Sequence, residues 1–355
     1  MTVGERAFLI QHRPVGGSAP VFIVAEAGVN HNGDPALATR LVDAAADAGA
    51  DAVKFQTFSA RALVSPQAPK AAYQRETTGS AESQLDMLAR LELSLEQHAA
   101  LQAHAAGRGL LFFSTPFDEA SADLLQSLGV LLFKLPSGEI TNLALLRHVA
   151  AKGRPIILST GMSTLDEVTE AVAAIREAGD PPLALLHCLS AYPAPVSEMN
   201  LRAMDTLRAR FGCPVGLSDH TLGIEIAVAA VARGAAIVEK HLTLDRNLPG
   251  PDHRASLDPR DFTDMVRAIR SVEAALGDGI KRPMPSETDT RAVARKSLVA
   301  ARAIRAGQTL TADLIAIRRP GTGIPPGDLA RVLGHRVRRG LAAGDVIEWG
   351  AVGDP

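Results

Sequence analysis

Two histidines lie at the ends of neighbouring apolar runs, where their side chains could share one ion. His220 ends the run "PVGLSDH", and His241 lies near the end of the next run, "AAIVEKHL". Imidazole together with carboxylate and water suits Mn, Fe, Co or Zn, and Glu26, Asp219 and Glu239 lie near the ends of such runs as well. A single histidine in this position is usually a hydrogen-bonded structural residue. The residues alone therefore leave a metal site and a structural role open.

Three lysines are placed where they could reach a phosphate or a carbonyl group, namely Lys54, Lys134 and Lys240. If His241 faces the site, the alternation of a strand places Glu239 with it and turns Lys240 to the other side. Lys54 and Lys134 could hold a phosphate as point charges, or one of them could form a Schiff base in an aldolase. A buried lysine paired for structural reasons is the third interpretation. Hydroxyl groups that fit phosphate or carboxylate binding occur at Thr115, Ser137, Ser159 and Ser218.

These side chains need strands that deliver them to one place. Short apolar runs alternate with helical segments, which is the pattern of βα units. Helices are predicted at 35–48, 95–107, 164–178 and 224–233, among others. The runs that fit strands are "VFIVAEAG", "DAVKFQTF", "LLFFSTPF", "LLFKLPSG", "PIILSTGM", "LALLHCLS", "PVGLSDH" and "AAIVEKHL". Eight such units are the number that closes a TIM barrel, so the predicted fold is an α/β protein with a (β/α)8 barrel.

Ionisable and hydroxyl residues fall toward the C-terminal ends of these eight strands. This is the barrel face where active sites are built. A purely structural role would not require every strand to end in such a group. The residues are Glu26, Lys54, Gln56, Ser114, Thr115, Lys134, Ser137, Ser159, Thr160, His187, Ser218, Asp219, His220, Glu239 and His241.

The chain is predicted to contain two domains. Residues 1–280 would form the barrel, 281–293 a linker rich in Pro, Gly, Ser and Thr, and 294–355 a small domain of short strands and turns. The segment 59–92 is a long insertion in the barrel, which predicts a lid or substrate loop. From residue 281 onward there are 13 Lys and Arg against 7 Asp and Glu, so this part of the chain is basic.

Composition excludes several classes of protein. The formal net charge of -2 argues against a role in binding nucleic acid or membrane through the whole protein. The two cysteines have no zinc-type spacing and predict no disulfide framework. The start of the chain has no signal-peptide pattern, and no apolar stretch has membrane-spanning length. The expected location is therefore the cytoplasm.

The motifs together resemble the bacterial sialic acid synthases, a family that condenses phosphoenolpyruvate with N-acetylmannosamine-type sugars to make nonulosonic acids. They run in order from residue 21 to residue 324, so the resemblance covers nearly the whole chain. The C-terminal segment resembles the SAF domain, also called antifreeze-like, which this family carries after its barrel. The motifs are "AEAGVNHNG", "VKFQ", "STPF", "KLPSGE", "ILSTGM", "LLHC", "GLSDHT", "EKH", "PGPDHRAS" and "RRPGTGI".

The resemblance implies a role for each matching residue. His220 and His241 would ligate a divalent metal, with Mn expected and Mg or Co as alternatives. Arg319 would reach the N-acyl group of the sugar from the C-terminal domain of a partner subunit, which implies a domain-swapped homodimer. Phosphoenolpyruvate would be bound by Lys54, Thr115, Lys134, Ser137, Ser159 and Ser218, with Ser190 at the phosphate site. The sugar or the reacting centre would be contacted by Glu26, Gln56, Tyr192 and Asp252, with Glu139 in support.

The implied reaction joins C3 of phosphoenolpyruvate to the aldehyde of the open-chain sugar, which the metal polarises. Water then adds at C2 and phosphate leaves by C–O cleavage, with Glu26 or Asp252 handling the proton of the water. The first reading of the acceptor is N-acetylmannosamine, giving N-acetylneuraminate. The alternative is a 2,4-diacetamido-6-deoxy sugar, giving legionaminate. A Schiff-base aldolase and a glycan-binding protein with an inert barrel are the rival classes.

Overall fold

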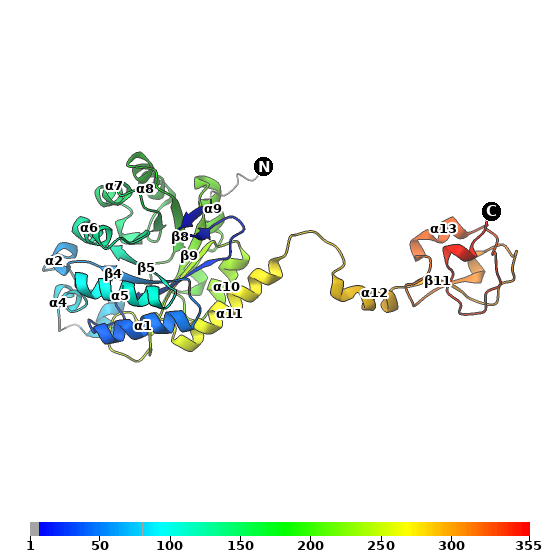
Figure 1. Cartoon of the computed structure of the whole chain (residues 1–355), viewed down its shortest axis with the longest axis horizontal. Coiled ribbons are helices and arrows are strands. Elements are labelled where there is room, and N and C mark those ends of the chain that lie inside the picture. Colours follow the sequence, from blue (N-terminus) through cyan, green and yellow to red (C-terminus); the bar gives the residue numbers. More distant parts are fainter. Residues whose placement is uncertain (1–6, 80) are drawn as a thin grey trace. The chain divides into compact units, whose positions relative to one another are not determined.

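The computed structural model describes residues 7–79 and 81–355. The chain divides into two compact units, Met1–Gly277 and Asp278–Pro355, and each is described by itself. Figure 1 shows the first unit as a sheet surrounded by helices and the second as a small unit with few regular elements. No helix in the described residues combines the length and apolar character needed to cross a membrane.

In the described part of the first unit, eight parallel strands form one sheet in the order β5-β4-β3-β10-β9-β8-β7-β6. The two outer strands in this order, β5 and β6, contact each other, so the sheet closes into a barrel. The predicted barrel is confirmed, and each predicted strand is present. The strands are β3 (Phe22–Gly28), β4 (Ala52–Thr57), β5 (Leu111–Pro116), β6 (Phe133–Leu135), β7 (Ile156–Ser159), β8 (Leu183–Cys188), β9 (Val215–Asp219) and β10 (Ile237–His241).

Helices cover the outside of the barrel (Figure 1). Several begin at a capping residue that the sequence supplies. Asp34 precedes Pro35 at the start of one helix, and its side chain accepts a hydrogen bond from the Ala36 amide. Thr164 forms a capping box with Glu167 at the start of another. The helices of this layer are α1 (Pro35–Asp47), α5 (Leu95–Gly107), α6 (Glu119–Ser127), α7 (Leu143–Ala150), α8 (Leu165–Glu177), α9 (Ala203–Phe211), α10 (Glu225–Ala232) and α11 (Pro259–Leu276).

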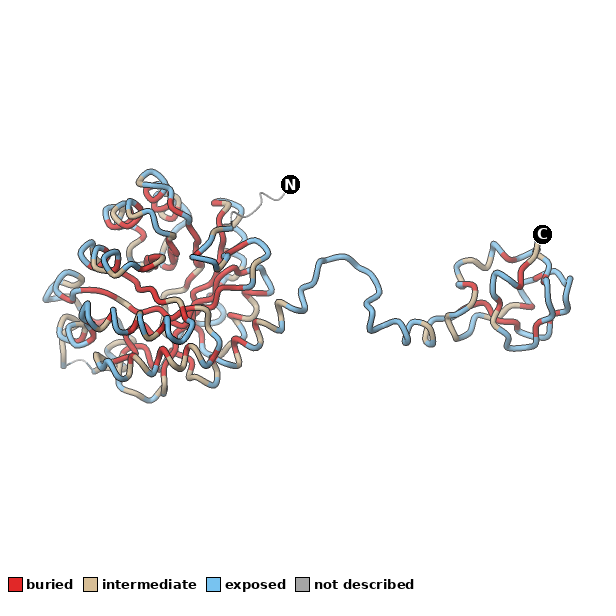
Figure 2. The backbone as a smooth tube through the Cα atoms, viewed as in Figure 1, coloured by how far each residue is buried: buried red, intermediate tan, exposed pale blue. Residues whose placement is uncertain are grey.

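The inside of the barrel is apolar at its amino end. Alternate residues of each strand point inward, and those nearest the strand starts form one buried apolar cluster, which includes Phe22, Phe113 and Ile237. A hairpin of β1 (Phe8–Ile10) and β2 (Arg13–Val15) adds Ile10 and Val15 to this cluster and closes that end. The hairpin was not predicted from the sequence. Figure 2 shows the strands as largely buried and the outward turns of the helices as exposed.

The insertion at residues 59–92 is more regular than a loop. It contains three short helices, α2 (Ala60–Leu63), α3 (Ala72–Thr78) and α4 (Gln84–Ala89). Ser83 caps α4 by accepting a hydrogen bond from the Asp86 amide. The segment follows strand β4 at its carboxyl end, so it lies where the barrel opens.

The second unit has a small apolar core of its own. Strands β11 (Ser297–Ala300) and β12 (Ile315–Arg318) pair antiparallel, and α13 (Leu329–Val332) packs with them around Leu298, Leu310 and Val337. The predicted linker at 281–293 overlaps a helical turn, α12 (Thr288–Ala294), whose residues are mostly exposed. Short 3-10 turns occur at η4 (Pro285–Glu287), η5 (Ala312–Leu314), η6 (Pro326–Asp328) and η7 (Trp349–Ala351).

Candidate active site

A cavity of about 430 Å³ opens at the carboxyl end of the barrel strands. Most of the residues that the sequence singled out line it. They are Glu26, Lys54, Gln56, Thr115, Lys134, Ser137, Ser159, Ser190, Tyr192, Ser218, His220, His241 and Asp252. The strand ends therefore converge as the barrel prediction required.

Two predicted residues do not line this cavity. Glu139 lies in the turn η1 (Ser137–Glu139) after β6, where its carboxylate accepts a hydrogen bond from Asn142 at 2.7 Å. Arg319 belongs to the second unit and is exposed there. Neither position conflicts with the role that the resemblance implies, and neither tests it.

The strand register explains which side chains meet. Glu26 on β3 lies opposite Lys54 on β4 and opposite His241 on β10. Glu239 on β10 lies opposite Ser218 on β9. Because inward positions recur every second residue, the apolar layer at the amino end is followed by a polar layer from the same strands.

Lys54 is the centre of a buried network of charges. Its ammonium group lies 2.8 Å from Glu26 and 3.7 Å from Glu239, and it donates a hydrogen bond to Thr115 at 3.0 Å. Burial disfavours its charge, but the carboxylates of Glu239 and Glu26 outweigh this effect and raise the pKa of Lys54. The ammonium is therefore held charged inside the protein.

Glu239 links the two lysines of the site. Its carboxylate lies 3.8 Å from Lys134 and accepts a hydrogen bond from Ser218 at 2.9 Å. Burial alone would raise the pKa of Glu239, but Lys134 and Lys54 bring it below its usual range. Burial lowers the pKa of Lys134, with Glu239 opposing. The sequence placed Glu239 at a strand end beside His241, yet its central position appears only in the structure.

Two carboxyl groups at the cavity have pKa values brought near neutrality. Burial raises the pKa of Glu26 to about 7, with Lys54 opposing and Glu239 adding to the rise. Burial also raises the pKa of Asp252 to about 6. A general acid or base works best when its pKa lies near the working pH, so both groups suit proton transfer.

An anion would find an unsatisfied partner in the depth of the cavity. The Ser159 hydroxyl is buried and makes no hydrogen bond with any residue that the structure describes. The Ser137 hydroxyl accepts from the Gly161 amide at 2.8 Å. A buried polar group without a partner is costly, and a bound phosphate or carboxylate oxygen would satisfy the Ser159 hydroxyl.

The two imidazoles fit a divalent metal. The rings of His220 and His241 lie 5.4 Å apart between centroids. The Leu189 carbonyl lies 2.9 Å from Nδ1 of His220 and can only accept, so it leaves Nε2 free to ligate. Burial lowers the pKa of His241 well below its usual value, which keeps it neutral, and its buried Nδ1 makes no hydrogen bond within the described residues, with Asp252 at 3.9 Å.

The protein alone offers an incomplete coordination sphere. Within residues 7–79 and 81–355, no group of three or more His, Cys, Asp or Glu side chains is arranged to hold an ion. Water and substrate oxygens would have to supply the other positions, more of them than the one open position of a typical catalytic zinc site.

Some strand-end residues point away from the cavity. Asp219, which the sequence grouped with the histidines, forms a buried ion pair with Lys240 at 2.6 Å on the outer face of the sheet. Lys240 faces outward as alternation predicted, and the register places Asp219 opposite it. Thr160 and His187 bond the carbonyls of Leu186 and Met199, at 3.0 and 2.6 Å. Ser114 likewise bonds Thr57, at 2.7 Å, away from the cavity.

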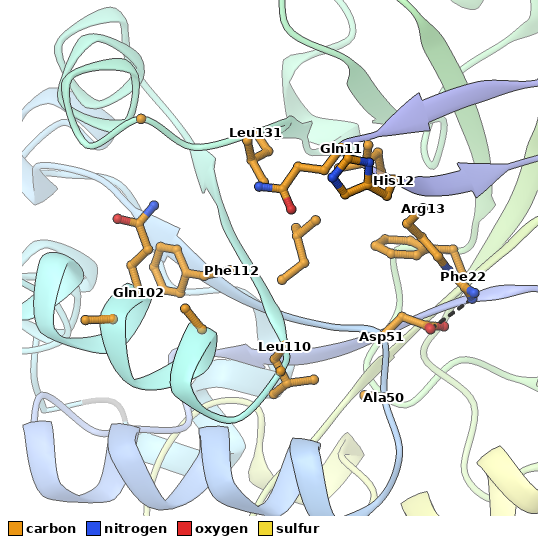
Figure 3. Close-up of a pocket in the computed structure, with 16 residues that line it drawn as sticks. Gln11, His12, Arg13, Phe22, Ala50, Asp51, Gln102, Leu110, Phe112 and Leu131 are labelled. Carbon is orange, nitrogen blue, oxygen red and sulfur yellow. Dashed lines mark ion pairs between the residues drawn. The ribbon is translucent and has the colours of Figure 1, made fainter.

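The opposite end of the barrel holds a second and larger cavity, of about 730 Å³ (Figure 3). It is lined by the β1–β2 hairpin and by residues that precede or begin the strands, among them Phe22, Leu110 and Leu131. Its charged contact is an ion pair at 2.9 Å between Arg13 and Asp51, both partly exposed. Figure 3 shows no cluster of ionisable side chains around its centre comparable with the Lys54 network.

Comparison with known proteins identifies relatives along nearly the whole chain. The chain is 47% identical over 341 residues to an N,N'-diacetyllegionaminic acid synthase of Legionella pneumophila, covering 95% of this chain and 96% of that protein. It is 49% identical over 304 residues to the Campylobacter jejuni protein of the same name, covering 85% and 91%.

A solved structure agrees with the fold. The N-acetylneuraminic acid synthetase of Leptospira borgpetersenii superposes with a TM-score of 0.71 at 36% identity, covering 81% of this chain and 95% of that one. The model of the NeuB family matches residues 41–281, and the model of the SAF domain matches residues 295–352. The predicted family is therefore confirmed, and the chain belongs to the NeuB family, with a SAF domain following its barrel in the sequence.

Proposed function

We propose that this protein condenses phosphoenolpyruvate with 2,4-diacetamido-2,4,6-trideoxymannose to give N,N'-diacetyllegionaminate and phosphate. The observation that carries the proposal is the division of one cavity into two chemically different ends. Its deep end holds buried lysines and hydroxyls, and its outer end is aromatic and aliphatic. The relatives from Legionella and Campylobacter, at 47% and 49% identity, support the same substrate.

The deep end suits phosphoenolpyruvate, which carries a phosphate and a carboxylate. Lys54 supplies a buried positive charge and Lys134 a second buried amino group. Ser159 supplies a hydroxyl that lacks a partner within the described chain. An anion bound here replaces the hydration that it loses with fixed hydrogen bonds and charges. Thr115, Ser137, Ser190 and Ser218 line the same part of the cavity.

The outer end suits a sugar with several methyl groups. Met87, Leu88 and Leu91 from the 59–92 insertion line it together with Phe58. The 2,4-diacetamido sugar presents a C6 methyl and two acetyl methyls, whereas N-acetylmannosamine presents one acetyl methyl and more hydroxyls. Burying the additional methyls stabilises the bound state. The diacetamido sugar therefore replaces N-acetylmannosamine, the first reading of the sequence, as the favoured acceptor.

His220 and His241 would hold the divalent metal, for which we propose Mn. When bound, such an ion acts as a Lewis acid on the aldehyde oxygen of the sugar. Lys54 and Lys134 would hold the enol phosphate while its C3 attacks the aldehyde carbon, which makes C2 cationic and turns the aldehyde oxygen into the hydroxyl of the product. Water then adds at C2, and phosphate leaves by cleavage of the C2–O bond. Glu26 or Asp252, with pKa values of about 7 and about 6, would take the proton of the water.

The proposal extends to a homodimer in which Arg319 of the partner subunit completes the sugar site. Arg319 is exposed in its own unit, so it is free to meet another copy. Mixing Glu26→Gln protein with Arg319→Ala protein tests this assembly. In a mixed dimer one site would combine an intact Glu26 with an intact Arg319, so recovery of activity would support a shared site. A mixture that stays inactive after the subunits have exchanged would contradict it.

The direct test measures phosphate release from phosphoenolpyruvate by purified protein with Mn. Each of the two sugars is supplied in turn, and each assay is repeated with EDTA. We expect metal-dependent release with the diacetamido sugar and slower release with N-acetylmannosamine. Release that persists in EDTA, with an adduct trapped by borohydride, would instead identify a Schiff-base aldolase. If folded, metal-loaded protein releases no phosphate with either sugar, the proposal is rejected.

A further inference from the structure

The 59–92 insertion forms one wall of the cavity. Its three short helices and the residues beside them line the cavity with a row of side chains, and none of these was singled out as a site residue from the sequence. They are Leu63, Val64, Ala71, Tyr73, Gln74, Gln84, Met87, Leu88 and Leu91. Most are apolar, in contrast to the charged strand ends below them.

Tyr73 occupies a special place in this wall. The chain contains two tyrosines, Tyr73 and Tyr192, and their rings pack together with centroids 5.0 Å apart. Tyr192 in turn lies 4.2 Å from the ring of His220. The three rings form a column that leads outward from the histidines, with Tyr73 at its outer end. Burial raises the pKa of Tyr73, so its hydroxyl stays neutral.

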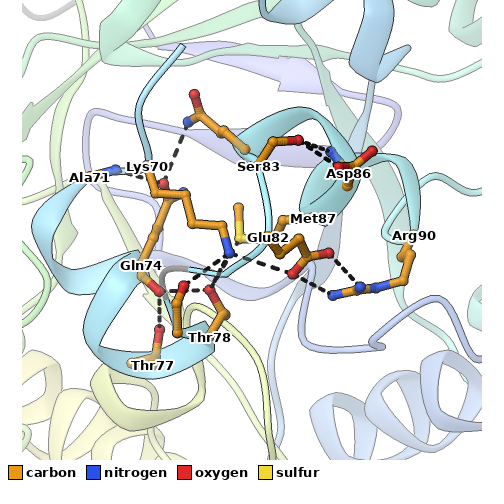
Figure 4. A network of polar contacts seen from close by, with 12 residues as sticks. Lys70, Ala71, Gln74, Thr77, Thr78, Glu82, Ser83, Asp86, Met87 and Arg90 are labelled. Carbon is orange, nitrogen blue, oxygen red and sulfur yellow. Dashed lines mark hydrogen bonds and ion pairs between the residues drawn. The ribbon is translucent and has the colours of Figure 1, made fainter. Parts of the chain in front are cut away.

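A buried lysine holds the wall in shape. Lys70 is 5% exposed, and Figure 4 shows its ammonium group enclosed by the insertion. It donates to the Thr78 hydroxyl at 3.0 Å and to the Gly79 carbonyl at 3.2 Å, and it lies 3.4 Å from Glu82. These contacts match the three donors of an ammonium group.

Further contacts tie this network to both helices. Arg75 donates to the Lys70 carbonyl at 2.9 Å, and Arg90 pairs with Glu82 (Figure 4). The Thr78 hydroxyl also lies 3.6 Å from the sulfur of Met87, which lines the cavity. Lys70 therefore connects α3, which carries Tyr73, to α4, which carries Met87, without touching the reacting groups.

We infer that Tyr73 is a specificity-determining residue for the acceptor sugar and that Lys70 positions it. This inference rests on the proposed function and names the residue that recognises the end of the sugar far from its aldehyde. With the aldehyde at His220 and His241, the far end of the sugar chain lies along the column of rings. The face of an aromatic ring favours a methyl and the C–H groups of an acetamide over a hydroxymethyl group. Tyr73 therefore selects for the 6-deoxy, diacetamido acceptor.

The test compares two acceptors in one assay of phosphate release. Wild-type protein, Tyr73→Ala and Tyr73→Phe are each measured with the diacetamido sugar and with N-acetylmannosamine. For Tyr73→Ala we expect kcat/KM for the diacetamido sugar to fall about 30-fold and that for N-acetylmannosamine by about threefold or less. The KM for phosphoenolpyruvate should change by about twofold or less, because the ring contact of Tyr73 is with Tyr192 and not with the lysines. Tyr73→Phe keeps the ring and should keep the preference.

Two failures can be told apart. Wild-type protein that releases phosphate with neither sugar rejects the proposed function, and the inference falls with it. Wild-type protein that is active, with equal losses for both sugars in Tyr73→Ala, rejects the inference alone. If Tyr73→Ala does not fold, Tyr73→Leu supplies the same comparison with the volume of the site better filled.

The positioning role of Lys70 has its own control. Lys70→Met should raise the KM for the diacetamido sugar about tenfold, leave the KM for phosphoenolpyruvate unchanged, and expose the insertion to protease. The matched variant is Lys152→Met, since Lys152 is also mostly buried and bonds Asp123 and Gln126 on the outer helices. It should change neither KM nor cleavage within 59–92. Equal effects of the two variants would reject a positioning role.

Discussion

The barrel has one cavity of about 430 Å³ at the carboxyl end of its strands and another of about 730 Å³ at their amino end. Both belong to the same barrel, but the larger cavity is lined mainly by the β1–β2 hairpin, helix α5 and the loops before the strands. The smaller cavity encloses Lys54, Lys134, Glu26 and Glu239, all at 5% exposure or less. The larger one carries the Arg13 and Asp51 side chains, at 30% and 19% exposure. The volume of a cavity is therefore a poor guide to function in this protein. The site is identified instead by buried charged groups that pair with one another.

The difference between the two ends comes from single residues in a repeating pattern. On β3 the inward positions are Phe22, Val24 and then Glu26. Burying an ion without a partner costs several kcal/mol, so each charge requires another from a neighbouring strand. The register places Lys54 opposite Glu26 and satisfies that requirement.

The largest effect is expected from Lys54→Met. This change leaves Glu26 and Glu239 close together without their shared cation, so phosphate release should fall about 1000-fold and the free energy of unfolding by about 3–5 kcal/mol. The control is Lys240→Met, which breaks the buried pair with Asp219 on the outer face of the sheet. It should destabilise the protein similarly while keeping most of the activity. Denaturant unfolding and phosphate release separate the two results, and comparable activity in both variants would contradict the comparison.

Removal of a proposed metal ligand should have the next largest effect. His241→Ala is expected to lower phosphate release more than about 100-fold and to weaken Mn binding by a similar factor. Bound Mn is measured by metal analysis after dialysis and by titration calorimetry, which needs no turnover. Substitution of His12 at the opposite cavity, as His12→Ala, should leave bound Mn unchanged. Full Mn binding by His241→Ala would exclude this residue as a ligand.

Two buried histidines at the carboxyl end should favour unfolding in acid. Burial lowers the pKa values of His31 and His253 to about 4 from the ordinary 6.5. The unfolded chain therefore binds more protons at these two residues, so their contribution to stability is lost as the pH falls from 6.5 toward 4. Glu26 and Asp252, with pKa values raised to about 7 and about 6, act in the opposite direction, so the test compares variants. Between pH 7 and pH 5, wild-type protein should lose at least about 1 kcal/mol more of its free energy of unfolding than His253→Gln, and equal pH dependence of the two proteins in denaturant unfolding would contradict this assignment.

The smallest effect is expected at the amino end. Arg13→Met removes a partly exposed ion pair with Asp51, which Arg270 also contacts at 3.0 Å. The free energy of unfolding should fall by about 1 kcal/mol or less, and phosphate release should stay within about twofold of wild type. A larger loss of activity would mean that the two ends of the barrel are coupled.

Much of the catalytic end could be predicted because strands have a period of two. A polar residue at an inward position near the end of a strand can be predicted to line the site, as Lys54 and His241 do. The same rule predicted from the sequence that Lys240 faces outward. Asp219 was misassigned because this rule was not applied to it. With the serine before it and the histidine after it inward, Asp219 turns outward, and the register of the folded sheet then places it opposite Lys240.

Other features left little trace in the sequence. The β1 and β2 strands have three residues each, which is too short for a recognisable alternation. The insertion was expected to be a lid because of its length, but the role of Lys70 depends on contacts with Thr78 and Glu82 that no local pattern reveals. The acceptor sugar left little trace for a related reason, since the motifs identify the reaction that the family shares. The proposal of the diacetamido sugar rests instead on the relatives and on the wall of the cavity.

The hairpin at the amino end has a consequence for the order of events during turnover. Ile10 and Val15 pack over an apolar layer at that end, so we expect ligands to come from the carboxyl end of the barrel into the catalytic cavity. The lysines lie at its floor and Tyr73 lies near its rim. Phosphoenolpyruvate must therefore enter before the sugar, and a sugar that arrives first blocks the way. This order of binding predicts that excess sugar inhibits the enzyme competitively with phosphoenolpyruvate. If saturating sugar gives no such inhibition, phosphoenolpyruvate has a second way into the cavity.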